Sequence, residues 1–225
     1  MKKKDFNRGW LFGAVGKEPS MQPVTLPHDA MLYEKRSKDA ATAGACGYFP
    51  GGAYVYVKRF LVPETWRTQS AVLEFEAVYQ NAQVFVNDAL VAEQWYGYTN
   101  FFVVLDPQLK YGEENEIKVI ADNSSVPNSR WYSGSGIYRD VNLMVGARIH
   151  IPADGVRITT PTVDPEASVV EICVDVKNLS RDREKVNVVS TITFDDKVVG
   201  EDTSVVTMFG QEQEEVIQRI CIKDA

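Results

Sequence analysis

The residues best suited to chemistry in this chain lie together in one short polar stretch. Asp122, Asn123, Asn128, Arg130 and Trp131 fall between two predicted strands. The apolar C–H face of a sugar ring stacks on an aromatic plane, while sugar hydroxyls need amide, carboxylate or guanidinium partners. The stretch therefore indicates carbohydrate binding. A purely structural role for Trp131 in this polar, Gly/Ser-rich loop stays open.

A second aromatic group precedes a predicted strand. Trp95, Tyr96, Tyr98, Phe101 and Phe102 lie close together in the sequence. Aromatic side chains bury the largest apolar area of any residue type. We therefore expect this cluster to pack in the hydrophobic core.

Hydrolytic chemistry has little support from the residue pattern. Glu74 and Glu76 share one face of a predicted strand, with Cα atoms about 7 Å apart, a separation of the order that glycosidases use. A solvated strand face explains this pair equally well, so we expect no catalytic role for it. The run 134–136 contains a serine between two glycines but has neither a following helix nor a lysine. It predicts a turn and not a nucleophile elbow or a phosphate loop.

The sequence also has few residues for metal or redox chemistry. Cys46, Cys173 and Cys221 are far apart in the sequence, so we interpret them as free thiols, the last two inside apolar strands. The chain has only His28 and His150, which cannot build a multi-histidine metal site. We expect no cofactor for these residues.

Composition excludes several classes of protein. With 24 Lys and Arg against 31 Asp and Glu, the 225-residue chain has a formal charge of −7, which disfavours nucleic acid as a partner. Its 44% hydrophobic residues are typical of a globular protein. No apolar run approaches a membrane span of about 18 residues, and no signal-peptide core follows Met1. We expect no membrane partner and a cytoplasmic location.

Period-two alternation of β-branched and aromatic residues dominates the first part of the chain and predicts strands. Asn87 and Asp88 tolerate the positive φ angles of a tight hairpin turn. Short strands separated by Gly and Pro favour a jelly-roll β-sandwich over residues 1–147. The expected strands are 54–60, 72–78, 82–86, 89–92, 101–105, 116–121 and 138–145.

The second part of the chain predicts an immunoglobulin-like β-sandwich over residues 148–225, so the fold class is all-β. The residues from Arg148 onward hold about five predicted strands, whereas such a sandwich has about seven. We therefore expect this sandwich to be incomplete and the chain to be a fragment of a longer polypeptide. The expected strands are 156–160, 169–177, 186–194, 197–199 and 215–222.

Several motifs in the sequence together carry a family resemblance. They are, in order, Phe6-Asn7-x-Gly-Trp10, Leu26-Pro27-His28-Asp29, Gly52-Ala53-Tyr54, Val84-Phe85-Val86-Asn87 and the run from Arg130 to Arg139. With these motifs the chain closely resembles the N-terminal region of glycoside hydrolase family 2, which contains β-galactosidases, β-glucuronidases and β-mannosidases. The resemblance is specific from Phe6 to about Val145 and weaker from Ile149 to Ala225.

The resemblance implies a jelly-roll sugar-binding domain, an immunoglobulin-like domain and then a (β/α)₈ barrel that carries two catalytic glutamates of a retaining glycosidase. A barrel alone needs about 250 residues. We therefore expect this chain to contain no catalytic residue and to be inactive by itself. A metal ion, where one is used, would belong to that absent barrel.

The same resemblance singles out the loop before Gly134, which in the family reaches toward the active site of the barrel. It implies Asn128, Arg130 and Trp131 as candidate substrate-binding residues. Several members have an aspartate where this sequence has Ser129 or Arg130, and a guanidinium donates hydrogen bonds but accepts none. Phe49 stands where some members have an asparagine.

The Arg-Trp-Tyr-Ser-Gly form of the loop resembles β-galactosidases more than β-glucuronidases. We expect the noncatalytic N-terminal portion of a retaining β-galactosidase-type glycosidase, which contributes one wall of the sugar pocket. Its partners would be a β-galactoside substrate and the barrel of the same polypeptide. A β-glucuronidase is the alternative within the family. A stand-alone carbohydrate-binding or adhesion module is the alternative outside it.

Overall fold

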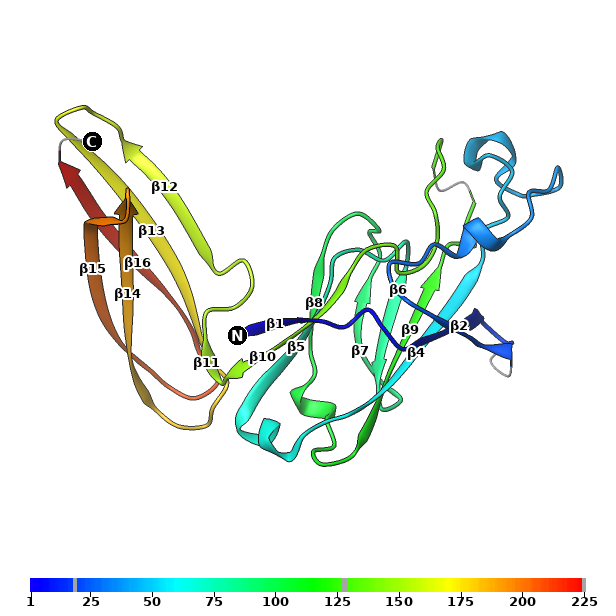
Figure 1. The fold of residues 1–225 in the computed structure, drawn as a ribbon, viewed down its shortest axis with the longest axis horizontal. Helices are drawn as coiled ribbons and strands as arrows, with labels where there is room; N and C mark the ends of the chain where they lie inside the picture. Colours follow the sequence, from blue (N-terminus) through cyan, green and yellow to red (C-terminus); the bar gives the residue numbers. More distant parts are fainter. Residues whose placement is uncertain (18–19, 127–128, 224–225) are drawn as a thin grey trace. The chain divides into compact units, whose positions relative to one another are not determined.

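The computed structural model describes residues 1–17, 20–126 and 129–223 and is built from β-strands joined by turns and short 3₁₀ segments (Figure 1). The chain divides into two compact units. The first comprises residues 2–145, and the second comprises the residues from Gly146 onward together with Met1. Each unit has its own hydrophobic core, so each is described separately.

The first unit is a jelly-roll sandwich of two antiparallel sheets, as the sequence predicts. The six-stranded sheet has the order β3 (Gln22–Val24), β2 (Trp10–Ala14), β4 (Ala53–Leu61), β9 (Glu114–Asp122), β6 (Ala82–Val86) and β7 (Ala89–Gln94). The four-stranded sheet has the order β1 (Lys2–Asp5), β10 (Val141–Ala147), β5 (Gln69–Phe75) and β8 (Phe101–Val104).

The core of the first unit follows from the alternation of side chains along its strands. In β9, Ile117, Val119 and Ala121 point inward and are fully buried, while the residues between them are half-buried. Trp10, Tyr56 and Phe75 are the largest fully buried side chains. This aromatic core fixes the two sheets that carry the loops described below.

The hairpin between β6 and β7 confirms the predicted turn. Asn87 and Asp88 have φ angles of 47° and 67°, the left-handed conformation that a two-residue hairpin requires. The Asn87 side chain also donates to the Oδ1 atom of Asn115 at 2.7 Å and accepts from the Glu116 amide at 3.0 Å. The turn is therefore tied to the neighbouring strand β9.

Helical structure is limited to 3₁₀ segments of three to five residues in the described part of the chain. Those residues contain no helix long and apolar enough to cross a membrane. The segments are η2 (Ala30–Tyr33), η3 (Ala43–Cys46), η4 (Glu64–Thr68) and η5 (Asp106–Gln108).

The second unit is a smaller sandwich. In one sheet the central strand β13 (Ala167–Asn178) pairs with β12 (Val156–Thr162), β11 (Ile149–His150) and β16 (Gln213–Lys223). The other sheet is a hairpin of β14 (Glu184–Phe194) and β15 (Lys197–Met208). Asp195 and Asp196 form its turn with positive φ angles.

Three details of the sequence interpretation are wrong. The strand expected over residues 197–199, β15, continues to Met208. The prediction is too short because the first inward positions, Gly200, Asp202 and Ser204, interrupt the apolar alternation before Val206 and Met208. Cys221 lies in a strand, β16, as expected, but its side chain is exposed and does not pack in the core. The strand expected to begin at Tyr138 begins at Val141, because the residues before it form an isolated bridge between Gly136 and Tyr79.

A candidate sugar-binding surface of exposed aromatic side chains

Asp29 connects two segments that are distant in the sequence. Its Oδ1 atom accepts hydrogen bonds from the amides of Met31 at 3.0 Å and Ser135 at 2.9 Å. Its Oδ2 atom accepts the hydroxyl of Tyr132 at 2.6 Å. The carboxylate therefore caps η2 and at the same time anchors the loop that carries Tyr132.

Gly134 and Asn123 determine the position of the loop that follows Tyr132. Gly134 has a φ of +72°, and a Cβ atom there would lie 2.8 Å from Oδ2 of Asp29, so only glycine fits. The side-chain amide of Asn123 donates to the Gly134 carbonyl at 2.9 Å and to the Ser135 hydroxyl at 2.8 Å. Asn123 is 2% exposed. The expectation that it belongs to the sugar-binding group is therefore wrong, because its hydrogen-bonding capacity supports the loop.

Trp131 is both exposed and fixed in position. Its indole N–H donates to the hydroxyl of Tyr98 at 2.9 Å, and 59% of the residue is exposed. Ser129 donates from its hydroxyl to the Trp131 carbonyl at 2.7 Å. An aromatic plane held by hydrogen bonds at its edge loses little conformational entropy when a ligand stacks on its face.

The segment after β7 presents further aromatic rings. Trp95, Tyr96 and Tyr98 are 68%, 59% and 40% exposed, so the expectation that they pack in the core is wrong. Gly97 explains this exposure, because a Cβ atom there would overlap the ring of Tyr79. The backbone of the segment therefore packs inward while the flanking side chains point outward. Phe101, which was also expected in the core, is half-buried and stacks on the buried Phe75 with ring centroids 5.0 Å apart.

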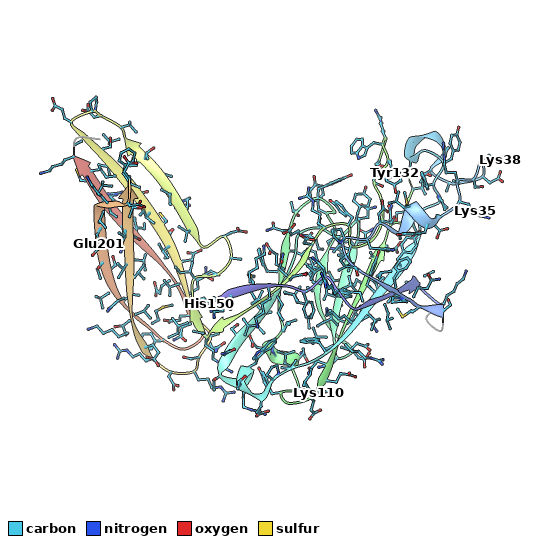
Figure 2. All side chains as sticks on the ribbon, viewed as in Figure 1. Lys35, Lys38, Lys110, Tyr132, His150 and Glu201 are labelled. Atoms are coloured by element: carbon cyan, nitrogen blue, oxygen red, sulfur yellow. The ribbon has the colours of Figure 1, made fainter. Side chains whose placement is uncertain are left out.

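We refer to Tyr96, Tyr98, Trp131 and Tyr132 as the aromatic rim. Tyr96 and Tyr98 contact each other edge to face with centroids 5.6 Å apart. Figure 2 shows Tyr132 at the end of the first unit where the loops gather, next to the segment that carries Lys35 and Lys38. The ring of Tyr132 also packs edge to face on Phe49, with ring centroids 5.1 Å apart.

The surroundings of Tyr132 in the rim, and of the nearby Tyr138, favour the protonated form of both hydroxyl groups. Burial, together with the hydrogen bond to Asp29 and its negative charge, raises the pKa of Tyr132. Burial also raises the pKa of Tyr138, whose hydroxyl donates to the Gly97 carbonyl at 2.7 Å. Both hydroxyls therefore remain neutral donors at physiological pH and keep the two loops in place.

The sequence candidates are distributed unevenly over this surface. Asn128 lies outside the described residues. Arg130 is exposed and precedes Trp131 in the chain. Sequence reasoning gave no role in the site to Asp29 or Tyr98, which hold Tyr132 and Trp131 in position. The Asp29 position immediately before the 3₁₀ segment η2 is a capping signal, whereas nothing in the spacing of Tyr98 indicates its indole partner.

The paired carboxylates have a structural explanation. The ammonium group of Lys3 lies 2.7 Å from Glu74 and 3.8 Å from Glu76. Asn142 donates to both carboxylates as well, at 3.2 and 3.4 Å. Within the described residues, no group of three or more His, Cys, Asp or Glu side chains is arranged to hold a metal ion. The rim thus offers stacking planes and hydroxyls, which suit the recognition of a sugar.

Comparison with known proteins agrees with this chemistry. Residues 40–146 match the family described as "Glycosyl hydrolases family 2, sugar binding domain". The chain is 35% identical over 199 residues to a β-galactosidase of Bacteroides ovatus, covering 84% of this chain and 23% of that protein. It is 30% identical over 189 residues to a β-glucuronidase of Bacteroides fragilis, covering 78% of this chain and 26% of that protein. The chain therefore spans about a quarter of the length of these curated relatives.

Solved structures share the whole fold. A crystal structure of a glycosyl hydrolase family 2 member from Bacteroides cellulosilyticus superposes with a TM-score of 0.89 at 27% identity, over 100% of this chain and 31% of that one. A β-glucuronidase of the same family has a TM-score of 0.84 at 20% identity, over 99% of this chain and 27% of that one, which shows the fold alone.

Proposed function

Because this chain carries the sugar-binding domain of glycoside hydrolase family 2 in residues 40–146, we propose that its aromatic rim binds the terminal sugar of a β-galactoside. The chain would act as the noncatalytic N-terminal part of a retaining β-galactosidase-type glycosidase. The catalytic glutamates would be supplied by a (β/α)₈ barrel that these residues do not contain.

The observation that carries the proposal is that Trp131 is exposed to solvent while a hydrogen bond holds its ring in position. Its indole N–H is bound by Tyr98 while most of the residue faces solvent. Asp29 accepts a hydrogen bond from the hydroxyl of Tyr132, the residue after Trp131. Large aromatic residues are normally buried, so the fixed exposure of several of them in two adjoining loops supports a ligand surface.

A single wall binds sugar weakly. One stacking plane contributes about 1 kcal/mol, whereas millimolar affinity corresponds to about 4 kcal/mol. We therefore expect the purified chain to bind methyl β-D-galactopyranoside with a dissociation constant above about 10 mM. We also expect it to hydrolyse no aryl β-galactoside.

The test combines saturation-transfer difference NMR with an assay of p-nitrophenyl β-D-galactoside hydrolysis. Trp131→Ala should reduce the saturation transfer, while Phe194→Ala, which removes an exposed ring from the second unit, should leave it unchanged. Turnover that co-purifies with the chain and follows its concentration would overturn the noncatalytic role. Saturation transfer as strong in Trp131→Ala as in the wild type would overturn the rim as a binding surface.

The same exposed rim also supports a second candidate function, a stand-alone carbohydrate-binding or adhesion module. Such a module must bind its glycan without help from another domain. Affinity of the isolated chain below about 1 mM would favour the module. Weaker binding that still depends on Trp131 favours the glycosidase wall.

A β-glucuronidase is the alternative within the family, since several similar proteins have that name. Arg130 is a fork of donors that can bind a carboxylate in two places. If the rim prefers uronates, Arg130→Gln should weaken binding of methyl β-D-glucuronide and leave methyl β-D-galactopyranoside unaffected. A galactoside wall predicts no preference for the glucuronide in the wild-type chain.

A further inference from the structure

A pocket separate from the rim residues opens on the outer face of the six-stranded sheet of the first unit. Its cavity volume is about 270 Å³, near the lower end of small-molecule sites, which begin at about 300 Å³. We call it the Trp95 pocket. It is lined by Asn81, Ala82, Gln83, Glu93, Trp95, Ile120, Asp122 and Ser125.

The pocket has one aromatic wall and a partly apolar floor. Trp95 lines it although 68% of the residue is exposed. Ile120 is half-buried in β9 and is the register partner of Gln83 in β6. An exposed indole above a small apolar floor suits the C–H face of a sugar ring better than a fully polar ligand.

The polar groups of the pocket are already oriented. Gln83 donates from its amide to Oε1 of Glu93 across the β6–β7 pair at 2.8 Å. Asp122 accepts the Ser124 amide at its Oδ1 atom at 2.9 Å. Asn81 donates to the Asp122 carbonyl at 3.0 Å. Each carboxylate has acceptor capacity for about four hydrogen bonds, so both can accept further bonds from ligand hydroxyls.

The charge of the pocket selects among sugars. Glu93 and Asp122 contribute two carboxylates, and the lining residues include no Lys, Arg or His. Lys118 lies two residues before Ile120 in β9, but its ammonium is 3.8 Å from Asp88 and 4.7 Å from the centroid of the Phe85 ring. The pocket therefore repels an anionic sugar and accepts a neutral one.

We propose that the Trp95 pocket binds one neutral hexose unit, stacked on Trp95 and hydrogen-bonded to Glu93 and Asp122, as a second sugar site distinct from the aromatic rim. The inference rests on the proposed function for the class of ligand and adds a site to it. A neutral carbohydrate that bears several sugar units could then contact the first unit at more than one position.

The test uses the indole N–H resonances of the four tryptophans in ¹⁵N-labelled wild-type chain, assigned by single Trp→Phe variants. Methyl β-D-galactopyranoside should shift the Trp95 resonance saturably. Glu93→Gln should weaken this shift about fivefold or more, because a charged acceptor forms stronger hydrogen bonds than a neutral one. The matched control Glu113→Gln replaces an exposed carboxylate outside the lining residues and should leave the titration unchanged.

Glucuronate at neutral pH is the charged comparison ligand. It should shift the Trp95 resonance at least tenfold more weakly than the neutral glycoside, and Glu93→Gln should reduce that difference. Equal titration by the two sugars, or a Glu93→Gln variant that binds like wild type, would overturn the proposal.

The indole resonances of Trp95 and Trp131 report on the pocket and on the rim separately, so failure of one proposal can be distinguished from failure of the other. A shift of Trp131 without Trp95 overturns this inference and leaves the proposed function in place. A shift of Trp95 without Trp131 supports the pocket and contradicts the rim. If neither resonance moves at about 100 mM glycoside, both proposals are overturned.

Discussion

The two units of this chain use their side chains very differently. All 4 Trp and all 10 Tyr residues lie before residue 139, in the first unit. They fill its core and also stand exposed on its loops. The second unit contains Phe194 and Phe209 as its aromatic residues, and both are exposed. The contrast shows which unit offers stacking surfaces for a ligand.

The cores differ in the same way. The second unit packs aliphatic residues such as Val174 and Ile220 around a buried amide, Gln218, which is 1% exposed. Gln218 accepts from Ser190 at 2.5 Å and donates to the Val188 carbonyl at 3.0 Å and to Ser204 at 3.1 Å. Hydrogen bonds from a buried amide thus join the strands of the second unit, whereas aromatic rings fill the core of the first unit.

The largest expected effect comes from the aromatic core. Phe75→Ala removes a fully buried ring and should lower the free energy of unfolding of the first unit by about 3–5 kcal/mol. Urea unfolding followed by tryptophan fluorescence measures this unit alone, since it holds every tryptophan. Val104→Ala, at a 38% exposed position of β8, is the control. A loss below about 1 kcal/mol for Phe75→Ala would contradict the role of aromatic packing.

The buried glutamine should give the next largest effect. Gln218→Ala leaves several buried polar groups without their partner and should destabilise the second unit by about 2 kcal/mol or more. Unfolding measured by far-UV circular dichroism should change, while the tryptophan transition should not. Gln213→Ala, at an exposed position of the same strand, is the control. An equal shift of both transitions would show that the two units unfold together.

The anchoring of the rim should give a smaller effect. Tyr132→Phe removes the hydroxyl that Asp29 accepts, and it should cost about 1 kcal/mol because Tyr132 is partly exposed. The amide of Ser135, which donates to the same carboxylate, should exchange faster with solvent in this variant. Tyr48→Phe, another exposed tyrosine of the same unit, should leave that exchange rate unchanged. Unchanged exchange in both variants would mean that the hydroxyl does not hold the loop.

The smallest expected effect is a pH dependence of the first unit. Burial lowers the pKa of His28 from its usual 6.5, and the charge of Asp29 opposes this only in part. The unfolded chain therefore binds a proton more readily, so the stabilising effect is complete above pH 6.5 and is lost as the pH falls toward the lowered value. His28→Gln should flatten the fluorescence-detected stability between about pH 6.5 and 5. A slope as steep as in the wild type would assign the pH dependence to other groups.

The strands were predictable from the sequence wherever one face is apolar. The alternation in β9 and β13 gave their positions to within a few residues. The full length of β15 was not predicted because Gly200, Asp202 and Ser204 face inward and interrupt the hydrophobic periodicity. The buried amide of Gln218 donates to the hydroxyl of Ser204, a contact that the periodicity cannot indicate. The jelly-roll fold follows from local patterns, while this exception depends on contacts between distant strands.

The candidate site was only partly predictable for a similar reason. The composition of the loop left Trp131 open between a ligand-binding and a structural role, and only the structure shows that the residue is exposed. The exposure of Trp95, Tyr96 and Tyr98 depends on Gly97 lying against Tyr79, a contact between separate segments. The burial of Asn123 depends on its bonds to residues 134 and 135. Residue type alone carries neither piece of information.

The measurement that tests the central claim most directly is the indole N–H resonance of Trp131 during titration with methyl β-D-galactopyranoside. The account predicts a saturable shift of this resonance, while the resonance of the buried Trp10 stays in place. Tyr98→Phe, which removes the hydroxyl that holds the indole, should weaken the titration. A Trp131 resonance that does not move at about 100 mM sugar would contradict the aromatic rim as a sugar-binding surface.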